Sequence, residues 1–188
     1  MMRIGAWRTR LQRFRKANGG AAAVEFALIV PILLLLYFGS VETSQLIIAD
    51  RRVNTVSGTL GDLVARSKDS ISQSTLDNYF SAASSTMGPL PIARLAQVVS
   101  LLRVDASGAA KVVWSRAYPS SVTPRAVNSV YDMSSSPQMR SLAQGKDLVI
   151  SEASYSYSPM LTLVFRDDIT LSHTNFYLPR FEGTITCC

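Results

Sequence analysis

Residues 19–39 carry the sequence GGAAAVEFALIVPILLLLYFG, which is apolar from Ala21 onward except for one carboxylate, Glu25. A helix from Ala21 to Val41 covers roughly 30 Å, the hydrocarbon thickness of a bilayer. No second run of this length follows in the sequence. The pattern therefore predicts a single transmembrane helix near the amino terminus. We expect Pro31 to kink it, because proline removes one backbone hydrogen bond from a helix.

Positive charge is concentrated ahead of this run. The remaining part of the chain has as many basic as acidic side chains, so the net charge of +6 belongs to residues 1–20 and gives no indication of a nucleic-acid partner. The positive-inside rule places this leader in the cytoplasm and the carboxyl-terminal domain in the periplasm, across the bacterial inner membrane. The basic residues of the leader are Arg3, Arg8, Arg10, Arg13, Arg15 and Lys16.

Two questions about the leader stay open at the sequence level. Trp7, Leu11 and Phe14 recur at spacings of three and four, which fits a short interfacial helix, and a simple cationic flank is the alternative. A secretory signal is the competitor of a membrane anchor. Phe38-Gly39-Ser40 is a poor version of its small-residue cleavage site, and a basic region of this length is unusual for a signal peptide.

Glu25 is the anomaly of the apolar run, because a carboxylate within the bilayer costs about 3 kcal/mol on insertion scales. It therefore needs a partner. Lys16 or Arg15 of an uncleaved leader is one choice. If the chain is cut after Gly20, Ala21 gains a protonated amine, and that amine can pair with Glu25 of a neighbouring subunit inside an apolar helix bundle.

The order of Gly20, the four residues AAAV, then Glu25-Phe26 and a hydrophobic run resembles the prepilin-type processing site. The form GGAAAVEFALIVPILLLLYFG resembles the TadE-like pseudopilins of the tight-adherence (Flp) pilus system, over about residues 15–45. Phe26 departs from the tyrosine usual in the major pilus subunits, whereas TadE-like proteins commonly have phenylalanine there.

The resemblance implies cleavage between Gly20 and Ala21 by a prepilin peptidase at the cytoplasmic membrane face, with Glu25 and Phe26 in peptidase recognition and assembly. It implies a minor pilin-like role in building Flp pili, either associated with the pilus or exported. Other pilins or pseudopilins and the assembly platform would be the partners. An uncleaved, signal-anchored periplasmic binding or scaffold domain is the alternative.

Helical periodicity continues beyond the membrane, over residues 42–68. Apolar residues recur there at intervals of three and four, and we expect a stalk helix. A continuous helix from Ala21 to about Arg66 would be roughly 69 Å long. A break near Gly58 is the alternative, since Gly58 and Gly61 each disfavour a helix by about 1 kcal/mol relative to alanine. The apolar positions are Leu46, Ala49, Val53, Val56, Leu60 and Leu63.

Residues 69–188 predict an α+β domain, so that the long membrane and stalk helix packs on a small antiparallel sheet in a pilin-like fold. The elements expected along this domain rest on capping, turn and alternation signals. They are a helix capped by Ser74 and ending near Ser84, a hairpin of 96–104 and 110–118 turning at 105–108, a short helix between Ser136-Pro137 and Gly145, and strands at 147–157 and 168–178. The apolar run 160–165 fits a buried strand or a covering loop.

Catalytic chemistry is not predicted, so we expect no enzyme, no cofactor or metal, and no small-molecule substrate. His173 is the only histidine and has no nucleophile motif beside it. We expect it to be hydrogen-bonded or solvent-facing. Asp167-Asp168 fits a solvated turn better than a cation site, and Trp114 fits the core better than a binding surface.

The two cysteines, Cys187 and Cys188, are adjacent at the carboxyl end, which excludes a disulfide framework and a spaced zinc motif. In an oxidising compartment they are candidates for a vicinal disulfide or a bond to another subunit. An inert, disordered end is the third alternative.

Overall fold

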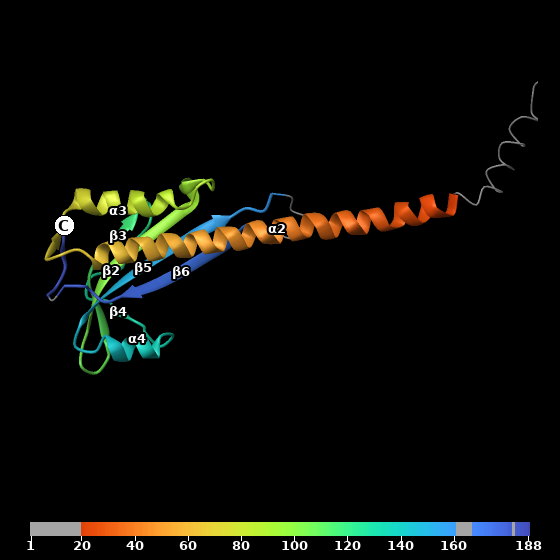
Figure 1. The fold of residues 1–188 in the computed structure, drawn as a ribbon. Helices are drawn as coiled ribbons and strands as arrows, with labels where there is room; N and C mark the ends of the chain where they lie inside the picture. Colours follow the sequence, from red (N-terminus) through yellow and green to blue (C-terminus); the bar gives the residue numbers. More distant parts are fainter. Residues whose placement is uncertain (1–19, 161–166, 182) are drawn as a thin grey trace, which may run out of the picture.

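The computed structural model describes residues 20–160, 167–181 and 183–188, so the leader and most of the apolar run 160–165 lie outside the described residues. A long amino-terminal helix leads into a curled antiparallel sheet, and only the second half of that helix lies against the sheet (Figure 1). This arrangement confirms the predicted α+β class, a long helix packed on a small antiparallel sheet.

Helix α2 runs unbroken from Gly20 to Ala65, 46 residues or about 69 Å. It does not break at Gly58. A Cβ atom on Gly61 would lie 2.5 Å from Cε2 of Tyr177, and one on Gly58 would lie 3.4 Å from the hydroxyl of Tyr177. Because Gly61 lets the Tyr177 ring lie against the helix, tertiary packing offsets its low helix propensity, whereas Gly58 makes only an ordinary contact with the Tyr177 hydroxyl.

Five strands form the main sheet in the order β4-β3-β2-β5-β6, and every neighbouring pair is antiparallel. The predicted hairpin is confirmed as β2 and β3, and the N–H of Gly108 donates to the carbonyl of Asp105 across its turn. The strand predicted at 147–157 is present with those bounds, and the last strand is one residue shorter at each end than predicted. The strands are β2 (Leu95–Val104), β3 (Ala110–Tyr118), β4 (Val130–Tyr131), β5 (Asp147–Tyr157) and β6 (Ile169–Tyr177).

Helix α3 (Gln73–Ser85) packs beside α2, and its start corrects the prediction. The N-cap is Ser72, whose Oγ accepts from the N–H of Thr75 at 3.2 Å; the expected cap, Ser74, lies inside the helix. Ser72 has extended backbone because it directly follows strand β1 (Ser70–Ile71). Asp77 does not cap the helix and accepts from the Gln73 side chain at 2.9 Å.

Helix α4 (Pro137–Leu142) begins at the predicted proline, although the Ser136 side chain makes no capping hydrogen bond. Gly145 follows it with a φ of 71°, a conformation that favours glycine and ends the helix as expected. The short 3-10 helix η1 (Ile92–Arg94) leads into β2.

The chain end returns to the start of the domain, a feature that the sequence did not indicate. Strand β7 (Thr186–Cys187) pairs with β1 in a parallel two-stranded sheet. Beside it, Trp114 is buried, as predicted, and its indole N–H donates to the carbonyl of Ile185 at 2.7 Å. Two-residue strands are too short to show alternation, so β1, β4 and β7 could not be predicted.

Two apolar cores lie on opposite faces of the sheet. The larger is shared by α2, α3 and the inner face, with Val53, Leu60 and Phe80 among its buried side chains. The smaller lies on the outer face, where Met139 of α4 packs against a cluster that includes Leu102 and Ile150. Four of the six expected stalk residues, Ala49, Val53, Val56 and Leu60, thus belong to the main core, and Leu46 packs against it. Leu63 is only half-buried, and α2 is free of the domain only in its first half.

Candidate functional site

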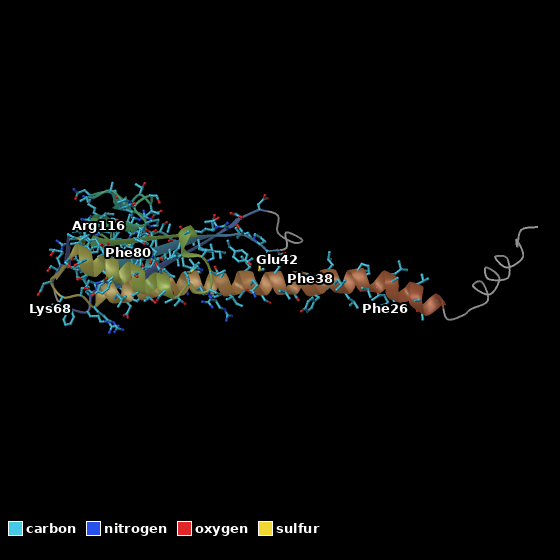
Figure 2. The ribbon with its side chains drawn as sticks, turned by 90° about the horizontal axis from the view of Figure 1, so that it is seen from above. Phe26, Phe38, Glu42, Lys68, Phe80 and Arg116 are labelled. Carbon is cyan, nitrogen blue, oxygen red and sulfur yellow. A yellow bond between two sulfur atoms is a disulfide. The ribbon has the colours of Figure 1, made fainter. Side chains whose placement is uncertain are left out.

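The first half of α2 projects from the domain and exposes apolar side chains around its circumference. Phe26 is 68% exposed and Leu36 is 62% exposed. Figure 2 shows Phe26 and Phe38 on a part of the helix that no other element covers. Among the described residues this is the one helix long and apolar enough to cross a membrane, with a mean hydropathy of 2.4 in its most apolar window. This helix fits a single-pass membrane anchor.

The residues predicted for processing and assembly gather at its tip. Gly20 is the first residue of α2, Ala21 the second, and both are exposed. Glu25 is also exposed, about 7.5 Å along the axis from Gly20. In the part of the chain that the structure describes, its carboxylate has no hydrogen-bond or ion-pair partner, and the predicted partners Arg15 and Lys16 lie outside that part.

Pro31 lies within α2, which continues through it without interruption. Proline has no N–H, so the carbonyl of Ala27 lacks its usual helical donor there. Farther along, three hydroxyls bond back to the helix's own carbonyls: Ser40 to Tyr37, and Thr43 to Gly39, both within 2.8 Å, and Ser44 to Ser40. These side chains therefore bring no unsatisfied donor to the end of the apolar segment.

The domain meets the helix immediately after the apolar segment. Glu42, the residue after Val41, is only 3% exposed. Burial raises the pKa of Tyr157, and the negative charge of Glu42 raises it further, so the end of β5 lies close to Glu42. The domain therefore contacts one face of the expected stalk almost from its first residue, while Ile47 and Ile48 stay exposed, and the sheet reaches down to the predicted membrane surface.

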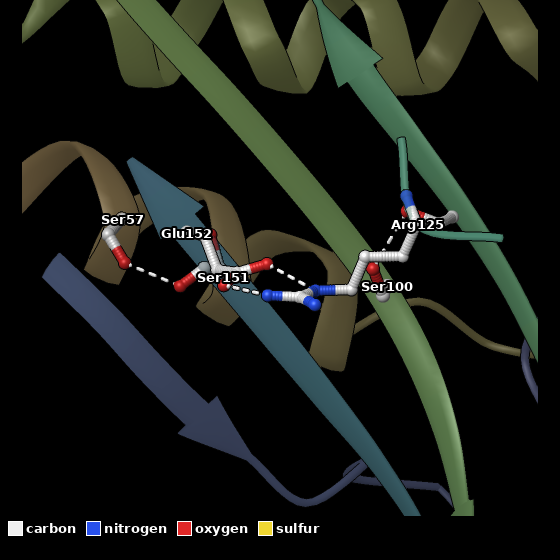
Figure 3. A network of polar contacts seen from close by, with 6 residues as sticks. Ser57, Ser100, Arg125, Ser151 and Glu152 are labelled. Atoms are coloured by element: carbon white, nitrogen blue, oxygen red, sulfur yellow. Dashed lines mark hydrogen bonds and ion pairs between the residues drawn. The ribbon is translucent and has the colours of Figure 1, made fainter. Parts of the chain in front are cut away.

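A row of polar contacts joins α2 to the inner face of β6. His173 Nε2 lies 2.7 Å from Asp50 Oδ1, and the Asn175 amide donates to Asn54 at 3.0 Å and to Ser57 Oγ at 3.1 Å. Ser57 in turn donates to the carbonyl of Ser151 on β5 at 2.7 Å (Figure 3). Sequence reasoning expected a partnered or solvent-facing His173, but it missed the Asp50 partner, more than a hundred residues away.

The outer face carries a second polar contact. Arg125 makes two hydrogen bonds of 2.8 and 2.6 Å to Glu152 (Figure 3). Its guanidinium also lies 4.7 Å from the ring centre of Tyr131. The hydrogen bond to Glu152 raises the pKa of Arg125. Beside this pair is an open groove of about 450 Å³ floored by small residues such as Ala96 and Ser172.

A second open groove, of about 610 Å³, lies at the opposite end of the sheet and includes Arg103 and Arg180. Both cations are already paired, Arg103 with Asp147 at 2.8 Å and Arg180 with Asp62 at 2.7 Å. Asp168 accepts from the hydroxyls of Ser156 and Ser158. Within the described ranges no three His, Cys, Asp or Glu residues come together as a metal site.

The carboxyl-terminal cysteines, Cys187 and Cys188, are bonded to each other in a disulfide. Cys187 belongs to β7, and the N–H of Cys188 donates to the carbonyl of Ile71. This end of the chain is therefore attached to the domain.

The projecting helix is where the chain is similar to known proteins. Residues 20–58 match the family model of the TadE-like proteins. The TadE-like match begins at Gly20, the expected processing residue, and ends at Gly58 within the domain core, so it excludes the sheet. It confirms the resemblance seen in the sequence, and together with the apolar helix it fits a protein related to the tight-adherence pilus. No curated protein and no solved structure matches the chain.

Proposed function

We propose that this chain is a minor pilin-like protein, a pseudopilin, that acts in assembling tight-adherence (Flp) pili. A prepilin peptidase would cut it after Gly20, and the freed helix would then pack with those of other subunits. The observation that carries the proposal is the TadE-like helix itself: exposed, apolar and with Glu25 as the one charged side chain between Gly20 and Val41.

Electrostatics gives Glu25 a role in this assembly. A carboxylate in the apolar layer costs about 3 kcal/mol. An ion pair at 4 Å contributes about 4 kcal/mol at an effective dielectric constant of 20. Pairing with the new Ala21 amine of a neighbour therefore offsets the insertion cost of the acid. It does so only at one axial stagger of the two helices, so Glu25 would set their register.

The proposed role is non-enzymatic, and the inner membrane, the peptidase, other pilins and the assembly platform are the partners. The leader would lie in the cytoplasm and the sheet domain in the periplasm. The polar contacts of the domain serve this role structurally, because they join α2 to β6 and the outer loop to β5.

Mass spectrometry of the full chain from cells that contain the peptidase tests processing. The expected mature protein begins at Ala21, and Gly20→Leu should retain the leader whereas the neighbouring control Gly19→Ala should still be cut. If the wild-type chain keeps its leader in such cells, the processing step is wrong. The uncleaved, signal-anchored scaffold then becomes the better account.

Pilus counts test the role of the acid. Glu25→Ala and Glu25→Gln should both be inserted, because neither adds charge to the helix. Both should still be cleaved, because Gly20 and Phe26 are unchanged, yet they should form few or no pili. Glu25→Asp keeps the carboxylate and should retain part of the assembly. Normal piliation of the Glu25→Ala strain would remove charge pairing from the proposal.

A further inference from the structure

The two edges of the five-stranded sheet differ in how they are protected. At the β3 and β4 edge, a loop folds back: the N–H of Val112 donates to Ser129 at 3.0 Å, and that of Asn128 donates to Val112 at 2.8 Å. Strand β3 also carries Lys111 and Arg116, and the β2–β3 register shifts between Leu101 and Leu102. Covering loops, charges and bulges are the devices by which proteins block pairing at an exposed edge.

In the part of the chain that the structure describes, strand β6 has none of these devices. Its sequence ITLSHTNFY contains no charged residue, no proline and no glycine over nine residues, and its pairing with β5 has no register shift. It is the last strand of the sheet, next to β5 (Figure 1). Over the described ranges, the backbone of β6 is bonded only to β5. Since half of the N–H and C=O groups of an edge strand point away from its neighbour, β6 presents a row of unpaired groups roughly 30 Å long.

This edge is also held in place. The Asp50–His173 contact and the Asn54–Asn175 hydrogen bond fasten the inner face of β6 to α2, and Tyr177 packs on Gly61. A strand that is already formed and fixed loses little conformational freedom when it gains a partner.

We propose that β6 is a docking edge that receives an extended strand from a different membrane-anchored protein. Main-chain hydrogen bonds would supply most of the affinity, as in other cases of β-strand addition. The inference rests on the membrane placement given under Proposed function, and it adds a partner surface on the sheet domain to the helix contacts proposed there.

The direction of β6 excludes a second copy of this chain as the partner. Ile169 pairs with Tyr157 near Glu42, and Tyr177 packs on Gly61, so β6 runs away from the membrane alongside α2. Antiparallel pairing of two β6 strands would turn the two α2 helices in opposite directions, which cannot occur for two copies inserted the same way in one membrane. Parallel pairing of two copies at equal depth would place each outward N–H opposite the same N–H of the other copy, so no ladder of hydrogen bonds would form. The remaining long edge of a second copy, β3, is blocked as described above.

The neighbouring side chains define the partner strand. On the outer face it would lie beside the exposed hydroxyls of Thr170, Ser172 and Thr174, which pair well with threonine or serine across strands. On the inner face it would lie beside His173 and Asn175, which favours polar side chains. The strand would be uncharged and would run toward the membrane, antiparallel to β6.

Amide hydrogen exchange of the full chain tests the edge. The chain is labelled in membranes of cells that make the whole pilus system, and again after purification in detergent. We expect the β6 amides to exchange at least roughly tenfold more slowly in the membranes than in detergent, because strand pairing protects them. Ser172→Lys should abolish this difference, and the matched control Ser172→Thr should keep it. If Ser172→Lys also loosens β5, Thr170→Lys on the same face takes its place.

Two results would overturn the inference. One is equal exchange of β6 in membranes and in detergent. The other is protection in detergent that rises with the concentration of the pure chain, because it would identify a second copy as the occupant. If the leader is cleaved but β6 is not protected, only this inference is wrong. If β6 is protected in a chain that keeps its leader, the processing step is wrong and the docking edge stands.

Discussion

Replacing Gly61 and Gly58 by alanine in turn separates helix propensity from close packing. Alanine is favoured over glycine by about 1 kcal/mol in a helix interior. At Gly58 the new Cβ would meet only the Tyr177 hydroxyl, at an ordinary 3.4 Å. At Gly61 it would lie 2.5 and 2.6 Å from two ring carbons of Tyr177 and 3.1 Å from Cβ of Ser151.

The two variants should therefore differ in sign. Overpacking costs about 1–3 kcal/mol, and the buried β5 backbone behind Ser151 leaves the Gly61 site little room to relax. Gly61→Ala should lose about 1–2 kcal/mol net of the propensity gain, whereas Gly58→Ala should gain up to about 1 kcal/mol. At about 2–4 °C per kcal/mol for a chain of this size, Tm should fall by roughly 2–8 °C for the first and rise by roughly 2–4 °C for the second.

Thermal unfolding of the full chain in detergent, followed by circular dichroism, measures both shifts. A double-mutant cycle with Tyr177→Ala isolates the clash, since removing the ring should relieve the Gly61→Ala penalty and give a coupling energy of about 1–2 kcal/mol. If Gly61→Ala stabilises the chain as much as Gly58→Ala, the close approach of β6 to α2 is wrong.

Three further predictions concern the domain. Hydrogen bonds from Arg66 and Arg180 hold the pKa of Asp62 below its usual value. The stabilisation by the Asp62 carboxylate is therefore present above the unfolded pKa and is lost as the pH falls below about 4. In a denaturant titration, Asp62→Asn should lower the free energy of unfolding by roughly 0.5–1 kcal/mol at neutral pH and by less in acid. Trp114→Phe should cost about 1 kcal/mol in the same titration, because it leaves the buried Ile185 carbonyl without its donor. Among the described residues the side-chain oxygen of the fully buried Gln97 has no partner, while its amide donates to Ser84 Oγ at 2.8 Å and to the Phe80 carbonyl at 3.4 Å. Because Ser84 Oγ also donates to that carbonyl at 2.8 Å, Gln97→Leu leaves neither group unbonded and should be neutral or stabilising; a loss above about 2 kcal/mol would contradict this.

Local patterns predicted the elements well because each is specified within a few neighbouring residues. The turn at 105–108 and the alternation at 147–157 place three strands almost at their observed bounds. Contacts between distant segments depend on the tertiary arrangement and not on neighbouring residues. Nothing near Asp50 indicates that its partner is His173, since the pairing depends on which strand α2 crosses. The choice of Ser72 over Ser74 as a cap likewise depends on β1, whose pairing with β7 is not a local property.

Because α2 is one unbroken helix, the angle between Glu25 and Asp50 around its axis is fixed. At about 100° per residue, Glu25 and Asp50 are close to seven full turns apart and lie within roughly 20° of each other around the axis. Asp50 faces β6, so the carboxylate at the tip of the helix points to the same side as the unprotected strand. Any rotation of the helix about its axis in the membrane carries both features together. The copy whose Ala21 amine pairs with Glu25 and the strand that docks on β6 would therefore approach α2 from the same side, the first within the membrane and the second above it.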